Sequence, residues 1–174
     1  ALAQEHSDAK GLVQSAYMLN PHPGFEPMPG GRVAIEKALA VLPPEAKEGR
    51  ALGLAELACT PPVSFDRERS LAYIREAEEL ARSSGALTSL AGVLHCKLYI
   101  CGGPDSGTDT RLTRDEIAQL SRAHPMRFPV APAELAMYAA VIALQAGNRT
   151  ELATALQEVE QNSRRLRHLE LVWQ

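Results

Sequence analysis

The sequence predicts an all-α fold in which antiparallel helical hairpins stack into a short superhelix. Apolar residues make up 45% of the 174 residues and aromatic residues only 5%, a balance that favours helices over sheets. Apolar residues also recur at helical spacing along most of the chain. Prolines and glycines, which interrupt helices, gather between these stretches. Together these three observations indicate helices joined by short connections.

The first part of the chain, residues 1–31, is expected to hold an N-terminal helix and an irregular connection. Apolar residues fall on one helical stripe from about Ala1 to Met18. The connection over residues 20–31 contains four prolines and three glycines, a composition that cannot continue a helix. We therefore separate this part from a helical repeat region over residues 32–174.

Paired helices open the repeat region. A helix over residues 33–42 ends at two prolines, and a second helix follows it up to Pro61 and Pro62. A third helix over about residues 66–84 carries an apolar stripe flanked by charges, with Gly85 at the stop position. Thr88 is expected to cap the next helix, which is apolar on more than one side and should therefore be central.

Capping patterns place the remaining helices. The segments Thr113–Glu116 and Asn148–Glu151 each have an N-cap residue three positions ahead of a glutamate, as in a capping box. We therefore expect a polar loop that ends at Thr113 and a helix that starts there. A nearly unbroken apolar helix over residues 133–146 follows, and the last long helix runs from Asn148 to about residue 167.

A period of about 40 residues relates successive hairpins. Similar late positions in the second helix of each hairpin are occupied by Leu42, Leu80, Leu120 and Val159. Each hairpin leaves one apolar face uncovered, so stacking of neighbours is needed to bury it. This pattern predicts a short superhelix similar to tetratricopeptide repeats. An unfinished apolar segment over residues 169–173 leads us to expect a fragment of a longer array.

Small residues are expected to form the contacts between hairpins. Ala77 and Ala139 each lie one helical turn from apolar neighbours, so both should face other helices at close range. A large charged residue at either position should disrupt the fold.

The net charge and the cysteines indicate which partners the protein can bind and in which cellular compartment it is expected. The formal net charge of −3 gives no basic excess of the kind that nucleic-acid binding needs. The cysteines Cys59, Cys96 and Cys101 fit neither a disulfide framework nor a paired zinc motif. No apolar run is long enough to span a membrane. We therefore expect a cytoplasmic protein that binds neither nucleic acid nor membranes.

Motifs for catalysis, cofactors or metals do not occur in the sequence. Phosphate-binding loops with a Gly-Lys pair, His-Glu-x-x-His and aspartate-rich magnesium motifs are all missing. His95 and Cys96 are adjacent, but neighbours on a helix point about 100° apart, so packing is favoured over a ligand or nucleophile role. The sequence therefore predicts a protein that is not an enzyme and holds no cofactor or metal.

Two charged clusters have structural and functional interpretations. Arg164, Arg165 and Arg167 precede His168 and can dock an acidic surface, or they can complement the dipole at a helix C-terminus, which we favour. The acidic residues Glu76, Glu78 and Glu79 are interpreted as a solvated helix face, paired with arginines one turn away.

Parts of the chain resemble the helical repeat region of large bacterial regulators that carry an AAA or STAND-type ATPase module. The resemblance lies in Ile35–Pro44 with Arg50–Ala55, in Ile74–Leu87 and in Leu144–Arg149. It covers roughly residues 32–174. In that family such arrays adjoin LuxR-type DNA-binding domains or class III nucleotide cyclase domains. The resemblance implies a role in bacterial signalling or transcription regulation.

Two functions of different classes are compatible with these features. The first is a non-catalytic scaffold that binds a protein, a neighbouring domain of the same polypeptide or a second copy of itself. The second is a sensor that binds a small molecule between hairpins and switches an attached ATPase or output domain. The candidate interaction surface comprises the basic cluster together with Tyr73, Tyr99, Arg127 and Tyr138.

Overall fold

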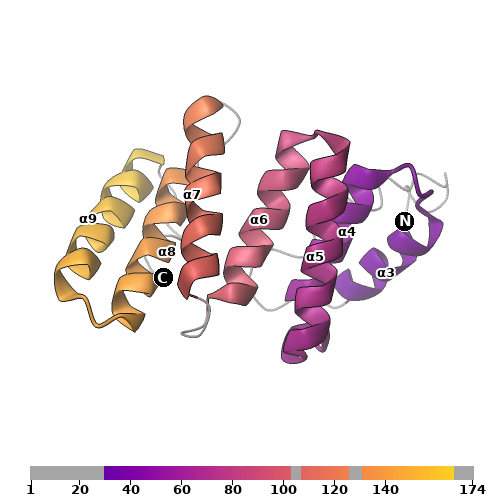
Figure 1. Ribbon diagram of the computed structural model, residues 1–174, viewed down its shortest axis with the longest axis horizontal. Helices are drawn as coiled ribbons and strands as arrows, with labels where there is room; N and C mark the ends of the chain where they lie inside the picture. Colours follow the sequence, from indigo (N-terminus) through magenta and orange to yellow (C-terminus); the bar gives the residue numbers. More distant parts are fainter. Residues whose placement is uncertain (1–29, 103–106, 126–130, 167–174) are drawn as a thin grey trace. The chain divides into compact units, whose positions relative to one another are not determined.

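The computed structural model describes residues 30–102, 107–125 and 131–166, and these residues form seven α-helices and one short 3₁₀ turn (Figure 1). No strand occurs within these ranges, so the predicted all-α fold is confirmed. Packing divides the chain into two compact units, Ala1–Ile100 and Cys101–Gln174. The predicted N-terminal helix and most of the connection after it lie outside the described residues.

Helices in the N-terminal unit pack as consecutive antiparallel neighbours (Figure 1). Proline pairs separate the first three helices, as the sequence predicts. The elements are α3 (Gly31–Val41), α4 (Lys47–Cys59), the 3₁₀ turn η1 (Val63–Phe65), α5 (Arg67–Ser84) and α6 (Leu87–Cys101).

Neighbouring residues in the sequence determine where helix α5 begins and ends. The Asp66 carboxylate accepts a hydrogen bond from the backbone N–H of Arg69 at 3.1 Å, which satisfies one of the free N–H groups of the first turn. Gly85 adopts the left-handed conformation at φ 71° that ends many helices. Helix α6 then starts at Leu87, so the prediction that Thr88 is its N-cap is wrong: Thr88 already lies in the first turn.

An alanine-rich core joins α4, α5 and α6. It includes Ala55 and Ala58 of α4, Ile74 and Ala77 of α5, and Val93 of α6. Ala77 has no exposed surface, as the sequence predicts. The small side chains let three helix backbones approach closely, and the larger Ile74 and Val93 fill the space that remains.

A buried serine completes the end of α4. Ser70 Oγ on α5 lies 2.9 Å from the carbonyl oxygen of Ala58 and 3.0 Å from that of Val63. The residue four positions after Ala58 is Pro62, which has no N–H to donate back to that carbonyl. The hydroxyl of Ser70 therefore supplies a hydrogen bond that the helix itself cannot make.

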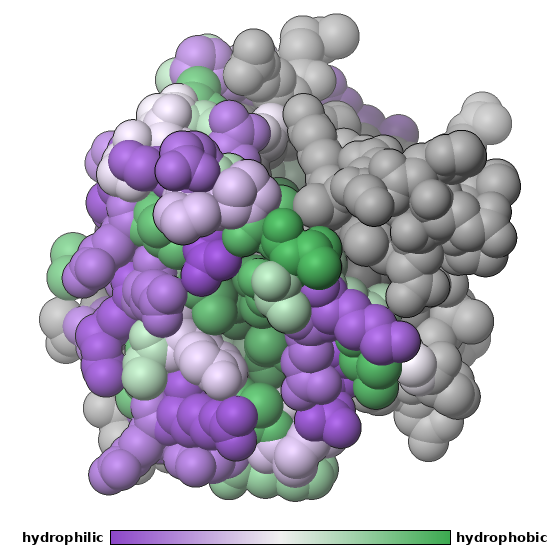
Figure 2. All heavy atoms as spheres, turned by 90° about the vertical axis from the view of Figure 1, so that its right-hand side faces the viewer, coloured by the Kyte–Doolittle hydropathy of each residue, from purple (hydrophilic) through white to green (hydrophobic). Residues whose placement is uncertain are grey.

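Helix α3 covers the core at the start of the described residues. Its Ile35 and Ala38 are buried, whereas Val33 and Val41 are 43% and 60% exposed. Figure 2 views the molecule from the side of α3 in Figure 1, where hydrophobic side chains gather in a band between hydrophilic ones. This helix therefore presents apolar side chains to solvent as well as to the core.

The C-terminal unit consists of α7 (Gly107–Ala123), α8 (Ala131–Gln145) and α9 (Arg149–Leu166). The predicted loop up to Thr113 and the capping box there are wrong: α7 begins six residues earlier, and Thr113 is only 3% exposed. Pro132 stands in the first turn of α8, where its missing N–H breaks no helical hydrogen bond. The apolar α8 packs against both α7 and α9.

The positions that repeat at about 40 residues lie on alternate helices. Leu42 is the C-cap residue of α3, and the other three positions belong to α5, α7 and α9. The period in the sequence therefore corresponds to one helical hairpin, as predicted.

Candidate functional site

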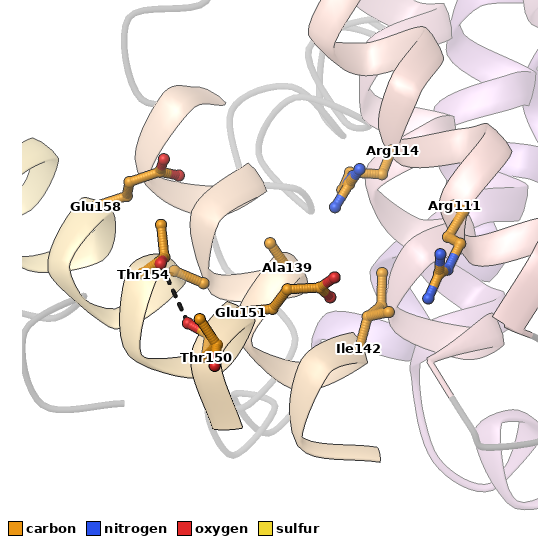
Figure 3. Close-up of a pocket in the computed structure, with 9 residues that line it drawn as sticks. Arg111, Arg114, Ala139, Ile142, Thr150, Glu151, Thr154 and Glu158 are labelled. Carbon is orange, nitrogen blue, oxygen red and sulfur yellow. Dashed lines mark hydrogen bonds between the residues drawn. The ribbon is translucent and has the colours of Figure 1, made fainter. Parts of the chain in front are cut away.

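A groove in the C-terminal unit runs over α8 between α7 and α9, with a volume of about 340 Å³ (Figure 3). All three helices of the unit contribute side chains to it. The lining residues are Arg111 and Arg114 of α7, Ala139 and Ile142 of α8, and Thr150, Glu151, Thr154, Ala155 and Glu158 of α9.

The lining residues form lengthwise stripes. On α9 the sequence positions 151, 154, 155 and 158 follow the spacing that keeps side chains on one helix face. The pairs from α7 and α8 are each three positions apart, which is again one face. Because every stripe runs along its helix axis, the groove runs along the helices. From Glu151 to Glu158 the helical rise gives a length of about 10 Å.

The floor of the groove is apolar and its walls are charged. Ile142 and Ala155 are buried and Ala139 is half-buried at the base. Arg111 and Arg114 approach from α7, whereas Glu151 and Glu158 approach from α9 (Figure 3). Opposite charges therefore occupy opposite walls.

These charges are not neutralised across the groove. Within the described residues Arg111, Glu151 and Glu158 form no ion pair, and Arg114 pairs with its own neighbour Asp115 at 3.1 Å. The Thr154 hydroxyl is engaged within α9, since it donates to the carbonyl oxygen of Thr150 at 3.1 Å. The groove thus offers a bound partner Arg111 and two carboxylates, all unpaired within the described residues, and Arg114, whose charge Asp115 partly neutralises.

The turn between α8 and α9 places Glu151 in the groove. Gly147 has φ 66°, and the N–H of Asn148 donates to the carbonyl oxygen of Ala143 at 2.9 Å, which closes the end of α8. The Asn148 side chain accepts from the N–H of Glu151 at 3.2 Å, so the predicted N-cap is confirmed. The reciprocal half of a capping box does not form, because the Asn148 N–H is already used. The carboxylate of Glu151 is therefore available to the groove.

The groove could not be found from the sequence, because the α7 side of it has the composition of a loop. Arg111 stands in the polar stretch before Thr113, which reads as a connection rather than as a helix. A helical projection that began at Gly107 would have put Arg111 and Arg114 on one face. Ala139 was expected to face another helix, whereas it lies at the groove floor and is only half-buried.

The predicted interaction residues do not line the groove. Tyr73 is half-buried on α5, where its hydroxyl lies 3.3 Å from Arg69 Nη2, and Tyr99 is 43% exposed on α6. Tyr138 is half-buried on α8 in the other unit. The structure therefore does not gather these tyrosines around the groove.

The basic cluster at the end of α9 also lies apart from the groove lining. Arg164 and Arg165 are exposed, and Arg164 pairs with Glu160 one turn earlier at 2.6 Å. Their position in the last turn agrees with the dipole interpretation. Arg127 and Arg167 lie outside the described residues.

The cysteines and His95 belong to the N-terminal unit or its border and are not arranged as a metal site. No group of three or more metal-binding side chains occurs among the residues that the structure describes. Cys96 Sγ lies 4.0 Å from a carboxylate oxygen of Glu56. The contact with Cys59, together with burial, holds the pKa of the Cys96 thiol well above its ordinary value. A high pKa disfavours the thiolate, which is the form that ligates metals and acts as a nucleophile.

No helix in the described part of the chain combines the length and apolar character needed to cross a membrane. Comparisons of the chain with protein-family models, with curated proteins and with solved structures found no match.

Proposed function

We propose that this protein is a non-catalytic helical scaffold, and that the groove over α8 binds a segment of another protein or of a neighbouring domain. The observation that carries this proposal is the open, lengthwise groove with an apolar floor and charged walls. Interfaces of this kind combine a buried apolar centre with a polar rim that selects the partner.

The exposure of the walls favours a protein segment over a small molecule. Five of the nine lining residues are exposed, namely Arg111, Thr150, Glu151, Thr154 and Glu158. Sites for small molecules usually enclose most of the surface of their ligand. A segment of protein chain can lie in an open groove with one of its sides in solvent, so it needs no such enclosure.

The sensor function remains the second candidate because of the size of the groove. Its volume of about 340 Å³ falls within the usual range for sites that bind small molecules. A ligand that binds only the folded chain would raise its melting temperature. A thermal-shift screen with metabolites and nucleotides separates the two functions, since the scaffold function predicts no shift from either class.

We place this scaffold in a bacterial regulator of signalling or transcription, in the cytoplasm. Support for this setting comes from the resemblance of residues 32–174 to helical repeat regions and from the hairpin period in the sequence. It also comes from the three cysteines, which are all free thiols. Free thiols suit a reducing compartment.

Selection of binding peptides tests the proposed function. A display library of random 18-residue peptides is selected against the full chain, and the selected peptides are then measured against two variants. Thr154→Trp places a large side chain in the groove, whereas Gln157→Trp places it at an exposed position of α9 outside the lining. We expect Thr154→Trp alone to abolish binding. Equal binding to both variants would refute a role for the groove.

A further inference from the structure

The groove is long enough to take about two turns of one more helix. Its stripes run parallel to the helix axes, and Glu151 and Glu158 are seven residues apart, which is the spacing of one heptad. In helix pairs that pack lengthwise, apolar side chains form the central seam and charged side chains flank it. The apolar floor corresponds to the seam of such a pair and the two charged walls correspond to its flanks, so the groove presents the surface that a further helix would pack against.

The charges of the walls determine what the missing helix must carry. The α7 wall presents Arg111 and Arg114, and the α9 wall presents Glu151 and Glu158. A partner helix therefore needs acidic side chains on the flank that faces α7 and basic side chains on the flank that faces α9. A helix with like charges on both flanks would be repelled by one wall.

Small residues on the floor allow such a helix to approach closely. Ala139 and Ala155 have short side chains, and Ile142 is 8% exposed. Apolar side chains of a partner helix can therefore insert between the walls and lose contact with water. The apolar seam supplies the attraction, and the charged flanks select the partner and its direction.

We propose that the groove binds an amphipathic α-helix of a partner protein whose apolar stripe has acidic residues along one flank and basic residues along the other. This inference rests on the proposed function and adds the chemistry of the partner. Because reversing a helix end to end exchanges its flanks, the walls also fix the direction in which the partner helix lies.

Four synthetic helices of 18 residues, with blocked ends and the same leucine stripe, test the proposal. The split-flank peptide has glutamates on one flank and lysines on the other. The mixed-flank peptide has the same composition, but the two charges alternate on each flank. The remaining two peptides carry only glutamate or only lysine on both flanks. Circular dichroism checks that all four are equally helical, since short helices are marginal in water.

Isothermal titration calorimetry of the full chain with each peptide measures the four affinities, which are then ranked. We expect the split-flank peptide to bind about tenfold more tightly than the mixed-flank peptide at low salt, from several weak ion pairs acting together. The difference should shrink as salt is raised. Arg122→Ala, at an exposed arginine of α7 outside the groove, should leave this ranking unchanged.

A change of wall charge should change the preferred peptide. With Glu151→Lys and Glu158→Lys both walls are basic, and we expect the peptide with glutamates on both flanks to bind best. Circular dichroism of the variant confirms that it is folded, and both positions are exposed in the parent chain. Unchanged ranking in this variant would overturn the proposal.

Other outcomes separate this inference from the proposed function. Equal binding of all four helices overturns the charge rule. If only extended or uncharged peptides bind and Thr154→Trp blocks them, the groove is a binding site but its occupant is not the helix proposed. Self-association of the chain that Thr154→Trp abolishes would make a second copy the occupant, which also overturns the inference. If no peptide responds to Thr154→Trp, both proposals fail.

Discussion

Lys97 on α6 reaches Glu78 on α5, with 2.8 Å between the ammonium nitrogen and a carboxylate oxygen. Glu78 also accepts from Arg82 on its own helix at 2.6 Å. The sequence predicts the second contact from its spacing of four residues, whereas the first joins two helices across the turn at Gly85. Glu78 is thus part of a tertiary contact and not only of a solvated helix face.

Stability at low pH should depend on Glu78. Burial raises the pKa of its carboxyl, but hydrogen bonds from Lys97 and Arg82 outweigh burial and hold the pKa below its ordinary value of 4.5. The contribution is therefore present above that value and is lost as pH falls through the lower pKa of the folded chain. We expect Glu78→Gln to lower the free energy of unfolding by about 1 kcal/mol at pH 7 and by less at pH 3.

Urea denaturation at both pH values measures this difference. Glu79→Gln is the matched control, because Glu79 is exposed on the same helix. An equal loss at pH 7 and pH 3 for Glu78→Gln would show that ionisation of Glu78 does not contribute.

Ser70→Ala should destabilise the N-terminal unit. The hydroxyl is buried and lies within hydrogen-bonding distance of the Ala58 carbonyl, which Pro62 leaves without its helical donor. Loss of a hydrogen bond to a buried carbonyl costs about 1–3 kcal/mol. Ser83→Ala, at an exposed serine of the same helix, should change the free energy of unfolding by less than about 0.5 kcal/mol. If chemical denaturation gives the same loss in the free energy of unfolding for both variants, the hydrogen bond of Ser70 does not stabilise the fold.

Ala77→Glu and Ala139→Glu should differ strongly, although the sequence predicts the same outcome for both. Ala77 has no exposed surface and packs in the core of the N-terminal unit, so a glutamate there is overpacked and unpaired. We expect a loss of several kcal/mol, comparable with the stability of a typical domain. Ala139 is half-buried at the groove floor, where a longer side chain can extend into open space. Its variant should remain folded, as judged by thermal melts followed by circular dichroism.

Asn148→Ala should weaken the start of α9. The Asn148 side chain accepts from the N–H of Glu151, and loss of such a cap costs about 1 kcal/mol. Asn162→Ala is the control on the same helix, because Asn162 lies in its interior, where alanine is the better helix former. We expect faster amide hydrogen exchange in the first turn of α9 for Asn148→Ala alone. Unchanged exchange there would contradict the assigned cap.

The fold could be predicted further than the site. Proline pairs, the Asp66 cap and the glycine at 85 act locally, so the ends of α3, α4 and α5 follow from neighbouring residues. The start of α7 does not follow from neighbouring residues, because Gly107, Asp109 and Thr110 are found in loops as well as in the first turn of a helix. The groove depends on how three helices lie against one another, and no local pattern encodes that arrangement.

Nuclear magnetic resonance titration of the isotope-labelled full chain with the split-flank helix shows where on the chain the helix binds. If the groove binds the helix, backbone amide shifts will concentrate along α7, α8 and α9, at and around Arg111, Ala139, Ile142, Glu151 and Glu158. We also expect Thr154→Trp to remove these shifts and Gln157→Trp to retain them. Shifts confined to α3–α6, or shifts that persist in Thr154→Trp, would contradict the claim that the groove binds the partner.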